Sequence, residues 1–537
     1  METNEKIKDG KTEKFADSEL WKKSKRGFFH VLFGRTTVII LLLVLQFAGL
    51  FGIFAYFERY VSLAYGGFAV IALIMAIYVT SSRANPAVKL SWIVLIMTFP
   101  VFGTLLYLFV DKEFGHHFMH RRLQRVLDST RRFTASDPNL VAELEASDKA
   151  LANMARYAGE KAGYPIYRAE YAHYFPEGEA FWLDLLDTLE KAEHFIFLEY
   201  FILEEGEMWG RILDILKRKA AHGVEVRVLY DGTCAITLLP YDYPKTLAKL
   251  GIHCRMFAPL RPFVSTHYNN RDHRKIAVID GKTAYTGGAN LADEYINRKN
   301  RFGHWKDAAV RIDGCAVRSF TLMFLQMWNI PQKTDEENYE KYLSASGADT
   351  AGKNRHGYVI PYADSPLDGE KVGETVYMDM INTACGHIYI FTPYLILDNE
   401  MTTALQNAAK RGVDVRIVLP SVPDHKIAFA LAKIHASELI PSGVRIYTYT
   451  PGFVHSKVFE SDGRRAAVGT VNLDYRSLYL HFECAAYFAD LPVIDEIRAD
   501  FDETFAVCRE LRAADLKKNT FLRRLYGGLL KLIAPLM

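Results

Sequence analysis

The sequence predicts an α/β protein in which N-terminal transmembrane helices precede two similar lobes, each a mixed β-sheet flanked by helices, with one active site at the lobe interface. Three observations predict this fold. Long apolar runs cluster near the N-terminus, strands alternate with helices after about residue 163, and a set of polar residues occurs twice at a constant spacing. A chain of 537 residues is long enough for two or three folded units.

The charge balance and the cysteines limit the classes of function. The chain has 65 Lys and Arg against 63 Asp and Glu, a net charge of +2. Such a balance lacks the global basic field of a nucleic-acid-binding protein, so we expect no nucleic-acid partner. The six cysteines are far apart and form no CxxC pair, which favours free thiols in a reducing compartment over disulfides.

The N-terminal region predicts a membrane anchor. After a polar leader, residues 1–35, the segment 36–110 contains three uncharged runs of 20 residues: Val38–Phe57, Val61–Thr80 and Ser91–Val110. At about 1.5 Å per residue, each run could cross a hydrocarbon core about 30 Å thick. No small-residue cleavage pattern follows the first run, so we expect an anchor rather than a removed signal peptide.

The topology of this anchor stays open between two or three spans. Basic residues precede the first run and follow the third, and the positive-inside rule places both flanks in the cytoplasm, which three complete spans would not allow. Either one run is re-entrant or interfacial, with the third and its Pro100 as the candidate, or the N-terminus lies outside.

The next segments are predicted to form the first lobe. A charged connecting region, 111–162, is expected to be helical and leads into lobe 163–331. In that lobe, His194–Leu203 predicts a buried strand, Trp209–His222 an amphipathic helix and Val224–Tyr230 the next strand.

The same order returns in a second lobe, 358–512, after a polar linker, 332–357. The matching elements are His387–Leu397, Met401–Arg411 and Val413–Leu419. Alternating strands and helices indicate mixed or parallel sheets covered on both faces. The basic and apolar tail, 513–537, fits a packed helix and an interfacial segment on anionic lipid equally well.

The repeated polar residues predict the site. Each residue of the second copy lies 182 positions after its counterpart in the first; the two sets are His273, Lys275, Asp280 and Asn290, and His455, Lys457, Asp462 and Asn472. Residues two apart on a strand face the same way, so each His and Lys should share one side of a strand. Asp280-Gly281 and Asp462-Gly463 predict hairpin turns.

These residue types predict phosphate chemistry. The ammonium groups of Lys275 and Lys457 and the side-chain amides of Asn290 and Asn472 are expected to bind an anion such as phosphate. Of the two histidines, one would attack phosphorus and the other would give a proton to the leaving alkoxide. Asp307 and Glu483 are expected to orient the histidine rings. His-x-Lys lacks the ligands and spacing of a zinc site, so no metal is expected.

The paired motifs resemble those of the phospholipase D superfamily. Within it, the stretches NPAVKLSWIVLIMTFPVFGTLLYLFV, FLEYFIL, GVEVRVLYDG and GFVHSKVFESDG resemble bacterial cardiolipin synthases. This resemblance implies two phospholipase D-like lobes that transfer a phosphatidyl group from one phosphatidylglycerol to another, release glycerol and pass through a phosphohistidine, with no cofactor. It assigns His273 as nucleophile and His455 as acid and base, and it gives Asp280 and Asp462 a structural role.

The resemblance also implies a multi-pass protein of the bacterial plasma membrane, with its lobes on the cytoplasmic side and membrane lipid as its partner. The motifs alone also fit a phospholipase D-type hydrolase, a phosphatidylserine synthase, an endonuclease or a lipid-binding protein that has lost activity. The low net charge and the anchor disfavour the endonuclease, and two complete motifs disfavour the inactive protein. The sequence leaves a monomer and a homo-oligomer open.

Overall fold

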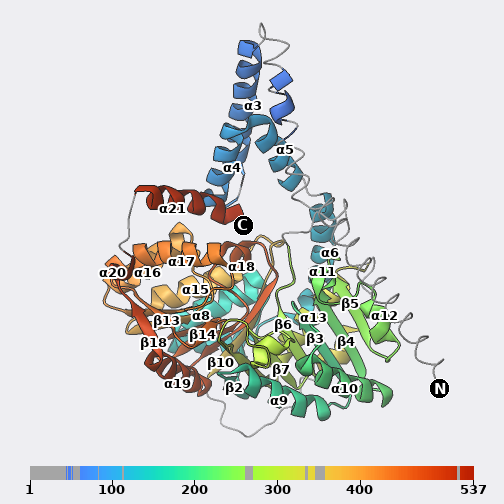
Figure 1. Ribbon diagram of the computed structural model, residues 1–537. Coiled ribbons are helices and arrows are strands. Elements are labelled where there is room, and N and C mark those ends of the chain that lie inside the picture. Colours follow the sequence, from blue (N-terminus) through green and yellow to red (C-terminus); the bar gives the residue numbers. More distant parts are fainter. Residues whose placement is uncertain are drawn as a thin grey trace, which may run out of the picture. The chain divides into compact units, whose positions relative to one another are not determined.

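The structure is a computed structural model. The chain divides into two compact units, residues 1–114 with 260–266, and residues 115–259 with 267–537 (Figure 1). The leader and most of the first apolar run lie outside the residues that the structure describes, which are 44, 46–49, 51, 52, 61–82, 84–111, 114–259, 270–332, 337–344, 357–516 and 521–536.

The N-terminal unit contains the helices α3 (Val61–Ser81), α4 (Pro86–Thr98) and α5 (Pro100–Asp111). The third predicted run is therefore two helices. Pro100 has no N–H to continue α4, and its fixed φ suits the first position of α5. Over the part of the chain that the structure describes, no helix combines the length and apolar character needed to cross a membrane. The predicted spans are not found there.

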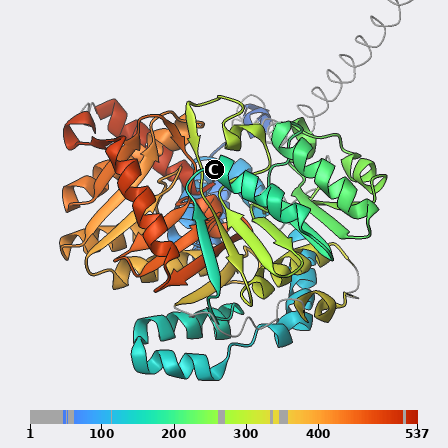
Figure 2. The ribbon, with the colours of Figure 1, turned by 90° about the horizontal axis from the view of Figure 1, so that it is seen from below.

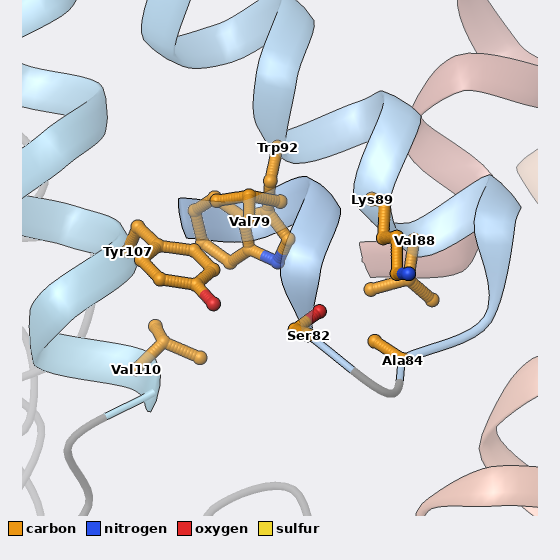
Figure 3. A pocket seen from close by; sticks show the side chains of 8 residues that line it. All are labelled: Val79, Ser82, Ala84, Val88, Lys89, Trp92, Tyr107 and Val110. Carbon is orange, nitrogen blue, oxygen red and sulfur yellow. The ribbon is translucent and has the colours of Figure 1, made fainter. Parts of the chain in front are cut away.

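These three helices surround a cavity of about 280 Å³. Figure 3 shows the side chains that line it, among them Trp92 and Tyr107, whose rings meet edge to face with centroids 5.2 Å apart. Lys89 also lines the cavity, and its Nζ donates to the carbonyl of Thr80 at 2.9 Å. The lining includes no histidine and no carboxylate.

The first lobe contains a seven-stranded mixed sheet. β3, β4 and β5 are parallel, and the remaining neighbours pair antiparallel. The strand order is β2 (Tyr171–Phe175), β9 (Ala309–Asp313), β7 (Thr283–Gly287), β6 (Lys275–Ile279), β3 (Phe195–Tyr200), β4 (Glu225–Asp231) and β5 (His253–Phe257).

The second lobe repeats this order within a nine-stranded sheet. β17, β16, β15, β11, β12 and β13 occupy the places of β9, β7, β6, β3, β4 and β5. The full order is β1 (Tyr167–Arg168), β10 (Tyr358–Asp364), β17 (Glu483–Ala489), β16 (Arg465–Gly469), β15 (Val458–Ser461), β11 (His387–Phe391), β12 (Asp414–Pro420), β13 (Arg445–Tyr449) and β18 (Cys508–Leu511). The predicted repeat of two mixed α/β lobes is confirmed.

Helices cover the outer face of each sheet, and others lie between the sheets (Figure 2). The outer helices of the first lobe are α9 (Gly178–Glu190) and α10 (Glu207–Ala221), and those of the second are α15 (Val372–Thr383), α16 (Asn399–Lys410) and α17 (Lys426–Leu439). Between the sheets lie α13 (Val317–Asn329) and α19 (Val493–Ala506). One buried cluster includes Ile276 of the first sheet and Val458 of the second, so the lobes share a core.

Two further segments pack against the lobes. The connecting region is helical as predicted, with α6 (Phe114–Thr130), α7 (Pro138–Ser147) and α8 (Lys149–Arg156). The predicted linker contains a short helix, α14 (Tyr339–Leu343). The residues Tyr339, Tyr342 and Leu343 of that helix are buried, at the i, i+3, i+4 spacing of one helix face.

The short elements are α11 (Cys234–Thr237), α12 (Tyr243–Ala248), α18 (Tyr475–Tyr479), α20 (Ala513–Leu516) and α21 (Phe521–Ile533), together with the strands β8 (His304–Lys306) and β14 (Gly452–Val454).

Candidate active site

Each copy of the motif is built on a β-hairpin closed by the predicted Asp-Gly turn. β6 and β7 form the first hairpin, and β15 and β16 form the second. At the turns, Asp280 and Gly281 have φ of 54° and 66°, and Asp462 and Gly463 have 56° and 67°. Two successive left-handed residues are the mark of a type I′ turn, in which Asp-Gly is favoured. The turn prediction is confirmed.

The two motif aspartates bind these turns to the start of the neighbouring strand in the sheet, β3 in the first lobe and β11 in the second. The carboxylate of Asp280 accepts hydrogen bonds of 2.7–2.8 Å from the backbone N–H groups of Glu193, His194 and Phe195. Asp462 accepts three equivalent bonds of 2.7–2.8 Å from Cys385, Gly386 and His387. Both aspartates lie at the far end of their strands from the histidines, so they support the hairpin and do not reach the reacting groups.

The His-x-Lys segments stand at the entry of their strands rather than within them. β6 begins at Lys275, and β15 begins one residue after Lys457. The backbone N–H of His273 donates to the carbonyl of Phe482 at 2.9 Å, and that of His455 donates to the carbonyl of Lys306 at 2.8 Å. The backbone N–H of each histidine is therefore hydrogen-bonded to the opposite lobe, and the strand of its own lobe begins only after the histidine.

The orienting acids are also exchanged between the lobes. Nδ1 of His273 lies 2.9 Å from both carboxylate oxygens of Glu483, and Nδ1 of His455 lies 2.7 Å from Oδ2 of Asp307. Both acids have no exposed surface. A carboxylate on Nδ1 fixes the ring and leaves Nε2 as the nitrogen for chemistry. The two acids have the orienting positions expected of them, each on the histidine of the other lobe.

Further donors hold each acid in place. Glu483 accepts hydrogen bonds from the hydroxyls of Thr470 and Ser477, while Asp307 accepts from the backbone N–H of Ala308 at 2.9 Å. Neither Thr470 nor Ser477 was predicted from the sequence. One signal could have indicated Thr470: it follows Gly469 at the position where Gly288 follows Gly287 in the first copy.

The small residue at Gly288 is required by the site. A Cβ there would lie 2.0 Å from Oδ1 of Asp307 and 3.0 Å from the carbonyl of His455. A side chain at this position would displace the acid that orients His455, whereas in the second copy the hydroxyl of Thr470 reaches its acid. The two halves of the site are similar in plan and different in detail.

Two buried lysines supply the positive charge. The side chains of Lys275 and Lys457 are each only 1% exposed. Nζ of Lys275 donates to the carbonyl of His273 at 2.8 Å, and Nζ of Lys457 lies 2.8 and 2.9 Å from the two ring nitrogens of His455. Burial lowers the pKa of Lys275 to about 8 and that of Lys457 to about 7.

The surroundings of the two histidines favour their neutral forms near pH 7. Burial, followed by the charge of neighbouring lysines, lowers the pKa of His273 to about 3 and that of His455 to about 4. Although burial alone would raise the pKa of Glu483 and Asp307, the histidine beside each acid holds its pKa below the ordinary range. Lys275 acts on His455 as well as on His273, so the two halves form one electrostatic site.

The two asparagines differ. Oδ1 of Asn290 accepts from the N–H of Ile202 at 2.9 Å, and its Nδ2 donates to the hydroxyl of Tyr295 at 2.8 Å, so most of its capacity is used within the protein. Oδ1 of Asn472 is buried and has no hydrogen-bond partner among the described residues. Of the two, Asn472 is the better placed to bind a polar ligand atom.

Among the residues that the structure describes, two groups of side chains have the spacing of metal ligands. The ligand atoms of His273, His481 and Glu483 lie within 4.8 Å of one another, as do those of Glu177, Glu179 and His304. In the first group Glu483 already orients His273, and the charge of Lys275 acts on both residues. A buried cation beside that group opposes a second one, which favours an anion.

Comparisons with known proteins agree with this arrangement. The sequence profile described as "Cardiolipin synthase, PLD-like domain" matches residues 185–314 and again 377–505, and the profile "Phospholipase_D-nuclease N-terminal" matches 67–110. A cardiolipin synthase from Geobacillus thermodenitrificans is 33% identical over 86% of this chain and 91% of its own length.

Other relatives extend the comparison. A cardiolipin synthase from Alkalihalophilus pseudofirmus is 31% identical over 88% of this chain and 93% of its own length. An uncharacterised protein from Streptococcus mutans is 47% identical over 86% of this chain and 99% of its own length. The crystal structure of a phosphatidylserine synthase from Haemophilus influenzae matches 73% of this chain and 97% of its own, with a TM-score of 0.54 and 16% identity, which shows a shared fold.

Proposed function

The chain belongs to the cardiolipin synthase family of phosphatidyltransferases, and from this premise we propose that it joins two phosphatidylglycerol molecules and releases glycerol at the site between its lobes. The observation that carries the mechanism is the exchange of orienting acids: Glu483 on His273, and Asp307 on His455. Neither motif histidine is oriented by an acid of its own lobe, so both motifs must act in one site.

In the first step, Nε2 of His273 attacks the phosphorus of one phosphatidylglycerol. A nitrogen–phosphorus bond forms, the bond from phosphorus to the glycerol head group breaks, and His455 gives its proton to the leaving glycerol oxygen. The carboxylate of Glu483 faces the ring of His273 as that ring becomes cationic. The ammonium groups of Lys275 and Lys457 face the phosphoryl oxygens, where negative charge develops.

In the second step, a head-group hydroxyl of another phosphatidylglycerol attacks the phosphohistidine. His455 accepts the hydroxyl proton, the nitrogen–phosphorus bond breaks, and cardiolipin leaves. Step one needs a protonated His455, although burial lowers the pKa of this residue to about 4. An anionic phosphodiester beside the ring favours the charged form of His455, so binding of the substrate raises the pKa of His455 and promotes its protonation.

The N-terminal unit supports a place at the membrane. We propose that its apolar segments attach the enzyme to the bacterial plasma membrane, with the lobes on the cytoplasmic face. The three apolar runs and the match of residues 67–110 to a phospholipase D N-terminal profile support this placement. The substrate is then a lipid of the same membrane.

Product analysis tests the proposed reaction. Purified full-length protein is incubated with labelled phosphatidylglycerol in mixed micelles, and the products are separated by thin-layer chromatography and mass spectrometry. We expect cardiolipin and glycerol in equal amounts. Phosphatidic acid without cardiolipin would make water the acceptor and would overturn the transferase assignment.

Matched variants connect the products to the site. His273→Ala and His455→Ala are each expected to abolish turnover. His387→Ala is the control, because His387 is a partly buried histidine of the second lobe that also contacts a buried acid, Glu460, but lies outside the site. Substantial turnover by either of the first two variants would contradict a shared two-histidine site.

A further inference from the structure

The C-terminal helix α21 has two apolar faces, and only one of them is covered. Leu530 and Ala534 are buried in a small cluster with Leu431 of α17. A Cβ on Gly527 would lie 3.3 Å from Ile434 of α17, so the two helices pack closely there. Lys531 forms an ion pair with Glu438 of the same helix. α21 is therefore fastened to the second lobe (Figure 1).

The other face of α21 is exposed and apolar. Leu525, Tyr526, Leu529 and Ile533 are 48–54% exposed. Counted from Leu525, the other three lie one, four and eight residues later, which places them along one side of a helix. A soluble helix normally presents polar residues on the side away from its core, so four large apolar side chains together require an explanation.

α21 lies close to the edge of the sheet that carries the reacting groups. The cluster beneath it includes Ile396, whose N–H donates to the carbonyl of Leu473 at 2.9 Å, one residue after Asn472. The turn that follows α21, Ala534–Leu536, contacts α18, which holds Ser477 of the site. These contacts place α21 beside the segment that follows the second motif.

More exposed apolar side chains occur at equivalent edges of both sheets. Lys275 pairs with Tyr200 at the carboxyl end of β3, so the reacting edge is the one where the parallel strands end. Ile236 and Tyr241 follow the carboxyl end of β4, and Val422 and Ile427 follow that of β12. These four side chains are 40–51% exposed. The apolar surface thus continues on both lobes.

We propose that the exposed face of α21 is a docking surface for an anionic phospholipid bilayer and that it holds the reacting edge of the lobes against the membrane. The proposal rests on the proposed function, because the substrate is a lipid. Residues 517–537 contain five basic and no acidic side chains. An apolar stripe within a basic segment matches an anionic membrane surface, whereas two such segments from two copies of the chain would repel each other.

Photo-crosslinking of the full-length protein tests the docking surface directly. The protein is reconstituted in vesicles of phosphatidylglycerol and phosphatidylcholine that contain a phospholipid with a diazirine in its acyl chain, and labelled peptides are mapped after irradiation. We expect label on residues 521–536 and less of it in vesicles of phosphatidylcholine alone. Label confined to residues 1–114 would overturn the proposal.

Activity in two substrate forms separates docking from chemistry. We expect Leu525→Ser with Leu529→Ser to lower cardiolipin formation in vesicles by about tenfold and to leave the turnover of a dispersed short-chain phosphatidylglycerol within about twofold of the unmodified protein. The control is Leu183→Ser, since Leu183 of α9 is 57% exposed. Equal losses in both substrate forms would overturn the docking role. If the unmodified protein made no cardiolipin from either form, the proposed function would fail, and the crosslinks would still decide the docking.

Discussion

The exchange of acids between the lobes predicts a large effect for Glu483→Gln. The carboxylate of Glu483 is fully buried and lies 2.9 Å from Nδ1 of His273. When Nε2 bonds to phosphorus, the ring becomes cationic and the carboxylate stabilises that charge. Two unit charges about 4 Å apart interact by about 4 kcal/mol at an effective dielectric constant of about 20. Since about 1.36 kcal/mol changes a rate tenfold, we expect kcat to fall about 10³-fold.

The assay is cardiolipin formation from labelled phosphatidylglycerol, and the control is Glu460→Gln. Glu460 is also fully buried and contacts a histidine, His387, at 2.9 Å in the same lobe. Glu460 contacts no reacting group, so Glu460→Gln should keep most of the activity and have a thermal stability similar to that of Glu483→Gln. If Glu483→Gln retained more than about a tenth of the activity, the carboxylate would not stabilise the reacting ring and the reasoning would be refuted.

Three other predictions follow from the same contacts. As pH rises through about 7 and then about 8, Lys457 and Lys275 lose their protons, so kcat/KM should fall on the alkaline side; a profile that stays flat to pH 9 would contradict their role in binding the anion. Asp280→Ala removes the acceptor of three backbone N–H groups and should lower the free energy of unfolding by about 3 kcal/mol in a denaturant titration; an unchanged midpoint would contradict the fastening role. A chelator should leave cardiolipin formation unchanged, because the lysines supply the positive charge; loss of activity that is restored by added metal would contradict this.

Much of the fold could be predicted because its local patterns are strong. The strand and helix predicted in each lobe match β3 and α10, and β11 and α16, to within a few residues at most boundaries. The Asp-Gly turns follow from backbone preference, since few other residue pairs accept two successive positive φ values. The constant spacing of the motifs also indicated one site made from two halves.

The contacts between the lobes could not be predicted from one sequence. In the sequence, Glu483 and Asp307 each lie at a fixed distance after the histidine of their own lobe. In the structure, each is hydrogen-bonded to the histidine of the other lobe. That exchange depends on how two whole sheets pack around a shared core, and no local pattern records it. Thr470 and Ser477 were missed for a different reason. They lie in the same lobe as Glu483, but the role of a hydroxyl depends on the acid that it contacts, and a single sequence does not show that contact.

The N-terminal region shows the limit of hydropathy as a guide. The twenty uncharged residues from Ser91 to Val110 are long enough for one span, although Pro100 made this run the candidate for a re-entrant or interfacial segment; in the structure Pro100 divides them between α4 and α5. A transfer scale measures how apolar a segment is, and it does not record where the backbone can no longer continue a helix. The backbone geometry of one residue, Pro100, therefore sets where α4 ends and α5 begins, and composition alone does not show this.

Trapping the covalent intermediate tests the central claim most directly. The protein is mixed with phosphatidylglycerol labelled at phosphorus, quenched in alkaline denaturant within one turnover, and the labelled peptide is identified by mass spectrometry. We expect one phosphatidyl group per chain, on His273, and none in the His273→Ala variant. Cardiolipin formation with no label on His273, or with label on His455 in its place, would contradict it.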